Sequence, residues 1–197
     1  MQRCAWCTSD PLYQDYHDHE WGQPSFDDQH LFAMLCFEGM QAGLSWITIL
    51  KKREHYYKVF ANFDPVAIAK FDEQKVAELM QDAGIIRNRL KIQAIITNAK
   101  AYLKITENQA FSDYLWAMSP NAVLNGLTHQ PLVNRPKTLA DIPAKTEVSD
   151  KMSKQLKKDG FKFVGPTICY AFMQAVGMVN DHLVDCPWHR ICEKTAS

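Results

Sequence analysis

The chain has 197 residues, of which 47% are hydrophobic, and its 22 basic side chains balance 22 acidic ones. These values are typical of one globular domain, and they exclude a mainly disordered chain and a protein held to nucleic acid by bulk charge alone. The longest mainly apolar stretch, 164–179, contains Pro166 and Gln174, so we expect no membrane span. Acidic residues interrupt the first 20 positions, so we expect no secretory signal. We expect a cytoplasmic monomer.

Apolar residues recur at helical spacing along most of the chain, and local signals mark the ends of the helices. Asp27 and Asp28 can cap one helix, Asp64-Pro65 is typical of a helix start, and Gly84 suits a left-handed helix end. The stretch 104–146 is broken by four prolines and is expected to be looser. Few segments alternate with period two, so the predicted fold is all-α. The longer helices are predicted over about 28–39, 44–60, 72–84, 87–103, 150–160 and 166–177.

Charges and aromatic residues are unevenly distributed. Residues 1–40 carry one base and seven acids, a net charge of −6, whereas residues 41–104 carry eleven bases and six acids, a net charge of +5. Eleven of the 22 aromatic residues fall within the first 60 positions. This pattern favours an aromatic pocket on one side and a track for a polyanion on the other. The alternative is a Trp-rich core surrounded by solvated charges.

Cysteine and histidine residues gather near the two ends of the chain. Without a secretory signal, six cysteines are better explained as reduced thiols or metal ligands than as disulfides. Zinc binds four such ligands tetrahedrally, and two from each end would close a structural site that pins the ends together. Chance enrichment with surface histidines is the alternative. Eight residues could supply the ligands: Cys4, Cys7, His17, His19, His182, Cys186, His189 and Cys192.

A short turn containing Gly84 joins two predicted helices over residues 79–91. Such a hairpin can direct backbone N–H groups and a helix N-terminus at a phosphate. Arg87, Arg89 and Lys91 add positive charge at the same place. The segment therefore indicates a phosphate contact, although an ordinary helical hairpin would have the same sequence features.

Glu38 lies in an apolar segment, between two predicted helices and close to glycines and Trp46. A carboxylate in apolar surroundings needs a partner. It can accept hydrogen bonds from indole or backbone groups, or it can contact a ligand that carries donors or positive charge. Further aromatic residues could supply stacking walls for such a ligand, namely Trp6, Tyr13, Tyr16 and Trp21.

Several motifs are spread over residues 3–182: RC at 3–4 with Trp6, DPLY at 10–13, YHD at 16–18, EWG at 20–22, QAGLSW at 41–46, DAGIIR at 82–87, GFKFVG at 160–165 and NDH at 180–182. In these segments the sequence resembles the type I DNA-3-methyladenine glycosylase (Tag) family, a branch of the helix-hairpin-helix glycosylases. The resemblance implies a single domain over 1–197. One lobe, about 44–115, holds the hairpin, and a terminal lobe, about 1–43 with 145–190, is pinned by structural zinc.

The resemblance also implies a monofunctional glycosylase that flips 3-methyladenine out of alkylated double-stranded DNA and hydrolyses its N-glycosidic bond. Lyase members of the superfamily have a lysine where Asn88 stands, so no lyase step is expected. The loop at Gly165-Pro166 is not followed by the superfamily's catalytic aspartate. Because methylation at N3 makes the base cationic, its bond to the sugar is already weak, and selecting and positioning it can supply much of the catalysis.

The resemblance assigns roles to individual residues. Glu38 is expected to be the catalytic residue, which recognises the lesion and stabilises it electrostatically. Leu44 is expected to fill the gap that the flipped base leaves in the duplex. The zinc ligands would be Cys4, His17, His182 and Cys186. The base would lie among Trp46, Tyr16, Trp6, Tyr13 and Trp21. The DNA backbone would be anchored at Gly84, Arg87, Arg89 and Lys91.

Two other functions are compatible with the same residues. One is a zinc-pinned module that binds DNA through the hairpin without chemistry, which the glutamate beside the tryptophans disfavours. The other is a zinc hydrolase, which would need an open coordination position on the metal. A site closed by four protein ligands has no such position.

Overall fold

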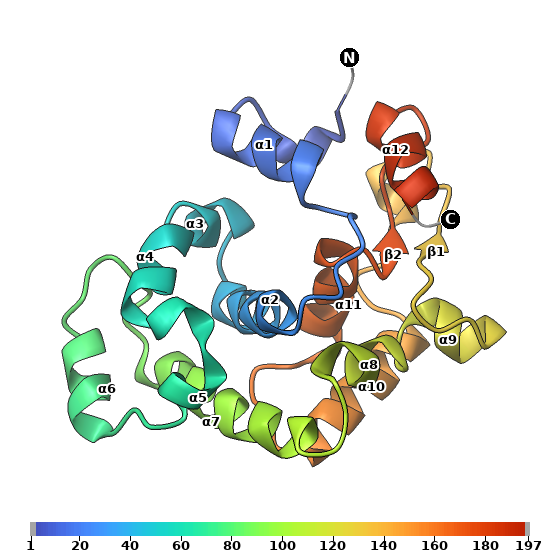
Figure 1. Ribbon diagram of the computed structural model, residues 1–197. Helices are drawn as coiled ribbons and strands as arrows, with labels where there is room; N and C mark the ends of the chain where they lie inside the picture. The colour runs from blue at the N-terminus through green and yellow to red at the C-terminus, as the bar shows by residue number, and fades with distance from the viewer. Residues whose placement is uncertain (1–2, 196–197) are drawn as a thin grey trace.

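Helices make up most of the computed structural model, which describes residues 3–195 (Figure 1). The prediction of an all-α fold is confirmed, with one addition: β1 (Leu132–Val133) pairs in parallel with β2 (Val179–Asn180). Short 3-10 helices are η1 (Ala5–Cys7), η2 (Ala61–Phe63) and η3 (Leu139–Asp141). The α-helices are α1 (Pro11–His19), α2 (Asp28–Gln41), α3 (Trp46–Leu50), α4 (Arg53–Val59), α5 (Pro65–Ile68), α6 (Glu73–Leu79), α7 (Arg89–Thr106), α8 (Phe111–Trp116), α9 (Pro120–Asn125), α10 (Glu147–Lys158), α11 (Pro166–Ala175) and α12 (Pro187–Thr195).

Helix α2 lies at the centre of the molecule (Figure 1). The Asp27 side chain caps it by accepting a hydrogen bond from the backbone N–H of His30 at 2.7 Å, as its sequence predicts. All residues from 31 to 40 are buried, so the helix is covered on every side rather than along one stripe. It packs against α3, α7, α8 and α11. A charged residue on this helix is therefore placed in the interior.

Several predicted boundaries differ from the structure. Helix α2 continues past Glu38 to Gln41, and α6 ends at Leu79 instead of near Gly84. The helix predicted over 44–60 is two helices, α3 and α4, which are separated at Lys51 and Lys52. Helix α10 begins at Glu147, ahead of the predicted start near 150, because Thr146 and Ser149 form a reciprocal capping box. The stretch 104–146 is also more regular than predicted, since it contains α8, α9, η3 and β1.

Gly84 does not adopt the left-handed conformation that the sequence predicts. Its role is close approach instead, because a Cβ atom at this position would lie 2.3 Å from Cδ2 of His55. The glycine therefore allows the turn between α6 and α7 to sit directly against α4.

The linker between α1 and α2 crosses the carboxyl end of α11. Gly177 has φ +71°, and a Cβ there would meet the backbone of Gln23 at 2.3 Å, so this crossing requires glycine. The Trp116 indole donates to the Ser25 carbonyl at 2.9 Å and holds the same linker. As a result α1 lies on the same side of the molecule as α12 (Figure 1). Within residues 3–195, no helix is long and apolar enough to cross a membrane.

Candidate active site and metal cluster

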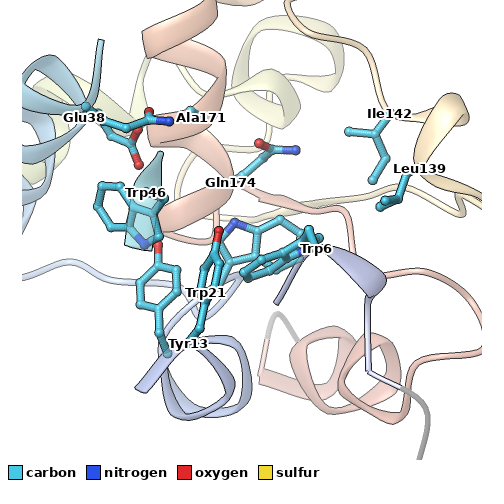
Figure 2. A pocket seen from close by; sticks show the side chains of 11 residues that line it. Trp6, Tyr13, Trp21, Glu38, Trp46, Leu139, Ile142, Ala171 and Gln174 are labelled. Atoms are coloured by element: carbon cyan, nitrogen blue, oxygen red, sulfur yellow. The ribbon is translucent and has the colours of Figure 1, made fainter. Parts of the chain in front are cut away.

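A cavity of about 270 Å³ lies where η1, α1, α2, α3 and α11 meet (Figure 2). Residues from the first 46 positions form most of its walls, and η3 with the loop after it closes one side. Every residue that was predicted to contact a base lines it. The full lining is Trp6, Tyr13, Tyr16, Trp21, Glu38, Gln41, Trp46, Leu139, Ile142, Ala171 and Gln174.

Aromatic rings form a continuous wall around this cavity. The ring centroids of Trp6 and Trp21 are 4.9 Å apart, and those of Trp6 and Tyr13 are 5.1 Å apart. The Tyr16 ring lies 6.4 Å from the Trp6 ring and 5.3 Å from the Trp46 ring, at 44° to the latter. Rings held in this way by their neighbours lose little freedom when a flat aromatic ligand stacks on them.

Glu38 and Trp46 each bring a buried polar atom into the cavity without a protein partner. Among the described residues, Glu38 Oε2 and Trp46 Nε1 have no hydrogen bond, although Glu38 is only 3% exposed. Burial raises the pKa of the Glu38 carboxyl to about 8. A buried polar group without a partner costs free energy, so these two atoms indicate a ligand that carries a donor and an acceptor.

The carboxyl end of α2 holds Glu38 in place and leads into an exposed turn. The Lys91 ammonium donates to the carbonyls of Met40 at 2.8 Å and Ala42 at 2.7 Å. Lys91 is 7% exposed, so its charge stabilises the end of α2, which differs from the predicted role as a phosphate contact. Leu44, the predicted wedge, lies in the following turn and is 39% exposed.

The turn between α6 and α7 is fixed by hydrogen bonds to α4 and to its own backbone. Asp82 accepts from the backbone N–H of Gly84, and its other oxygen contacts His55 Nε2, each at 2.7 Å. The His55 contact is the main reason why the pKa of the Asp82 carboxyl is lowered. Arg87 is exposed and has no ion pair with a described residue, whereas Arg89 pairs with Glu73 at 2.6 Å. Arg87 is thus the freer of the two cations.

A second cluster joins residues from the two ends of the chain. The ligand atoms of four buried residues lie within 4.8 Å of one another, and these residues are Cys4, His17, His182 and Cys186. The Cys186 sulfur is 3.6 Å from His17 Nε2 and 3.7 Å from His182 Nδ1, and the Cys4 sulfur is 3.7 Å from the same His182 atom. A tetrahedral zinc with its usual bond lengths separates sulfur from nitrogen by about 3.6 Å, so the cluster fits this ion.

The remaining ring nitrogens of both histidines are held by hydrogen bonds. His17 Nδ1 lies 2.8 Å from Asp18 Oδ1, and Arg3 in turn pairs with Asp18 at 2.8 Å. His182 Nε2 lies 3.1 Å from the carbonyl of Trp21. Since a carboxylate and a carbonyl can only accept, the outer nitrogen of each histidine carries a hydrogen. In the neutral imidazole this leaves the lone pair of the other nitrogen directed at the cluster, as a metal ligand requires.

Among the described residues, the other four candidate ligands do not belong to this cluster. Cys7 is buried without joining it, and Cys192 accepts a hydrogen bond from Gln23 at 3.3 Å. His19 is mostly exposed, and His189 Nε2 lies 2.8 Å from the Asn134 carbonyl. The geometry therefore divides the eight candidate ligands into four that form the cluster and four that lie outside it.

Five residues of the cavity were not among the predicted base contacts: Gln41, Leu139, Ile142, Ala171 and Gln174. Leu139 and Ile142 belong to a region where no helix was expected, so no pattern marked them. Gln174 did leave a signal, because it is a polar residue within the otherwise apolar helix α11. In the sequence alone it only interrupts an apolar stretch.

Comparisons with known proteins agree on one family. The sequence profile of the methyladenine glycosylase family matches residues 6–190. The chain is 56% identical to DNA-3-methyladenine glycosylase 1 of Escherichia coli K12, over 94% of this chain and 96% of that protein. A crystal structure of a 3-methyladenine DNA glycosylase I superposes with a TM-score of 0.89 at 52% identity, covering 94% and 98% of the two chains. A variant of such an enzyme in complex with 3-methyladenine superposes with a TM-score of 0.87 at 38% identity, covering 95% and 97%.

Proposed function

We propose that this chain, which belongs to the methyladenine glycosylase family and is a DNA-3-methyladenine glycosylase, flips 3-methyladenine out of alkylated duplex DNA. It then hydrolyses the N-glycosidic bond of the flipped nucleotide. The observation that carries this proposal is the buried Glu38 carboxyl group, which faces an aromatic cavity without a protein partner. A cationic base with an exocyclic amine offers this carboxyl group both charge and a donor. The aromatic walls offer stacking and cation–π contacts to the same ligand.

The reaction needs little from the protein beyond selection and positioning. When the bond between the sugar C1′ atom and the base breaks, the base takes the bonding electrons and leaves as a neutral molecule. Water adds its hydroxyl group to C1′ and releases one proton. The positive charge of the bound lesion favours the ionised form of Glu38, and the carboxylate then stabilises that charge. The cavity keeps the base in the geometry that favours departure. With Asn88 as the cap of α7 and not a lysine, no Schiff base forms at that position.

The decisive experiment is chromatography of the bases that the purified protein releases from methylated duplex DNA. We expect 3-methyladenine, and we expect release to fall strongly in Glu38→Gln, which keeps the shape of the side chain and loses its charge. A protein that binds this DNA and releases no base would be a binding module instead. Activity lost as soon as a chelator is added, with the fold intact, would favour the zinc hydrolase.

We assign the DNA contacts to the hairpin and to the turn after α2. Gly84 allows the hairpin to pack on α4, Arg87 and Arg89 face outward, and Leu44 is exposed beside the cavity. These positions support a helix-hairpin-helix lobe, about 44–115, that anchors the backbone while Leu44 fills the gap left by the flipped base. The terminal lobe, about 1–43 with 145–190, supplies most of the walls of the base pocket. Trp46 comes from the hairpin lobe, and Leu139 and Ile142 come from the segment between the two.

Zinc is the ion that we assign to the cluster of Cys4, His17, His182 and Cys186. Two sulfur and two nitrogen ligands are a usual set for structural zinc, and four protein ligands leave no open position for chemistry. Bound there, zinc would stabilise the fold by joining the chain ends. Among the described residues no disulfide joins any of the six cysteines, which fits a compartment that keeps thiols reduced, and we place the protein in the cytoplasm. Because one chain provides the whole pocket, we expect it to act as a monomer.

A further inference from the structure

Gln174 brings an amide group from α11 into the cavity. In Figure 2 its side chain lies between Glu38 on one side and Ile142 on the other, with its amide oxygen on the side of Glu38. Its amide nitrogen donates to Asp181 Oδ2 at 2.8 Å. Among the described residues its amide oxygen has no hydrogen-bond partner. The oxygen is thus the polar atom of this residue that a bound ligand can use.

Asp181 holds the amide in this orientation from outside the cavity. It is 1% exposed and lines a neighbouring cavity of about 360 Å³. Its Oδ1 atom accepts from the Asn134 amide at 2.7 Å, and its Oδ2 atom accepts from the Tyr170 hydroxyl at 2.7 Å as well as from Gln174. Asp181 belongs to the NDH segment at 180–182, whose His182 is part of the metal cluster. Asp181 itself is neither in that cluster nor in the lining of the base pocket.

The direction of the Gln174 amide follows from elementary hydrogen-bond chemistry. A carboxylate accepts and cannot donate, so only the NH2 end of the amide can face Asp181. A half-turn of the amide would place two acceptors against each other in a buried position, which costs free energy. Gln174 consequently presents an acceptor to the cavity and cannot present a donor.

We propose that Gln174 is a specificity-determining residue that accepts a hydrogen bond from an N–H group of the bound base, and that Asp181 is the positioning residue that fixes its amide. This inference rests on the proposed function and adds a second acceptor to Glu38. A purine with an exocyclic amine satisfies such an acceptor. A 6-oxo purine turns a carbonyl towards the same place and leaves buried acceptors facing each other, so it binds more weakly.

The test is the ratio of two dissociation constants, measured by titrating the full-length protein with free bases. The probes are 3-methyladenine and 3-methylhypoxanthine, which differ by an amine and a carbonyl at C6. Gln174→Met keeps the length of the side chain and removes the acceptor. We expect it to lower the preference for 3-methyladenine by about three- to tenfold, the range that one hydrogen bond supports.

Asp181→Asn tests the positioning role through the same ratio. With Asn134 still donating to position Oδ1, the new amide keeps its oxygen there and turns its NH2 group towards Tyr170 and Gln174. The Tyr170 hydroxyl, which donates to Asp181 in the wild type, then accepts from that NH2 group. The Gln174 amide then turns over and presents NH2 to the cavity, which shifts the preference towards the 6-oxo base. The double variant Gln174→Glu with Asp181→Asn presents an oxygen again, so we expect it to recover the original preference.

Gln155→Met is the matched control. This glutamine also donates to an aspartate, Asp159, at 2.7 Å, but it lies on α10 and does not line the cavity. Its ratio should equal that of the wild type. If Gln174→Met weakens both bases equally, or lowers only the melting temperature, Gln174 merely ties α11 to its neighbours and the inference is wrong. A wild-type protein that binds neither base and releases none from DNA would overturn the proposed function itself.

Discussion

The Glu38 carboxyl group makes the free energy of unfolding depend on pH. Burial raises its pKa from 4.5 to about 8 in the folded protein, so the neutral form is the stable one inside the cavity. Its stabilising contribution is complete below pH 4.5 and is lost as the pH rises to about 8. Over that window the slope approaches about 1.4 kcal/mol for each pH unit.

Glu38→Gln should remove this slope, because an amide does not titrate. We expect the variant to gain free energy of unfolding relative to the wild type between pH 5.5 and pH 8.5, measured by urea denaturation. Glu107→Gln changes an exposed carboxyl group and serves as the control. Parallel pH profiles for Glu38→Gln and the wild type would mean that Glu38 is ionised in the folded protein at neutral pH.

Trp46 should contribute to base binding mainly through its ring. Trp46 is 9% exposed, and its ring centroid lies 5.3 Å from that of Tyr16. Loss of one base–aromatic contact costs about 1–3 kcal/mol of binding free energy. Titration of Trp46→Ala with free 3-methyladenine should show a weakening of this size. Trp46→Phe keeps an aromatic ring and removes the unpartnered Nε1 donor. If Trp46→Phe binds as weakly as Trp46→Ala, the indole N–H and not stacking is the main contribution.

At the scale of elements, the hairpin between α6 and α7 should bind DNA through phosphate contacts. Arg87→Ala should weaken binding to all duplex sequences alike and reduce the slope of log K against log salt by about 0.9, the value for one contact. Arg89→Ala should have a smaller effect, because Arg89 already pairs with Glu73 at 2.6 Å. Fluorescence anisotropy at several salt concentrations measures both quantities. An unchanged slope for Arg87→Ala would leave the hairpin with a structural role only.

Elements whose signals are local could be predicted from the sequence. Asp27 caps α2, and Asp64 with Pro65 starts α5, because a capping side chain and its target lie within three residues. The division of 44–60 into α3 and α4 could not be read in this way. The same holds for the two-residue strands, whose partners are far apart in the chain and too short to show a period.

The site shows the same limit. Aromatic residues and Glu38 stand out because their chemistry is unusual in the sequence, and the family motifs assign them to one pocket. The hydrogen bond between Gln174 and Asp181 depends on how the turn after α11 folds. Neither residue has a sequence feature that would predict this bond. Spacing likewise left eight candidate metal ligands open, whereas three-dimensional proximity selects four.

At the scale of the whole molecule, the uneven charge of the chain is partly neutralised within the fold. Lys51 pairs with Asp10 at 2.7 Å, and Arg53 pairs with Glu20 at 2.6 Å, so bases of the positive middle segment meet acids of the negative first segment. These pairs hold α1 and its following linker against α3 and α4, where Tyr16 faces Trp46. Part of the predicted track for a polyanion therefore serves to close the pocket.

The metal cluster should determine whether the terminal parts of the molecule stay together. We expect one zinc per chain, and we expect His182→Ala and Cys186→Ala to lose both zinc and stability. The free energy of unfolding should fall by about 2.7 kcal/mol or more if free zinc exceeds its dissociation constant a hundredfold. Elemental analysis of the purified proteins measures the first quantity and urea denaturation the second. Stability should fall because Cys4 and His17 can no longer be joined to the last helix through the ion.

Cys169→Ala separates the loss of metal from the cost of a core substitution. Cys169 is also a fully buried thiol, but it lies on α11 outside the cluster and donates to the Val164 carbonyl at 3.5 Å. This variant should lose some stability and keep its zinc. Full zinc content in both His182→Ala and Cys186→Ala would instead assign the ion to a set that includes Cys7, His189 or Cys192. Because those residues lie outside the four-residue cluster, binding there would require the chain ends to rearrange.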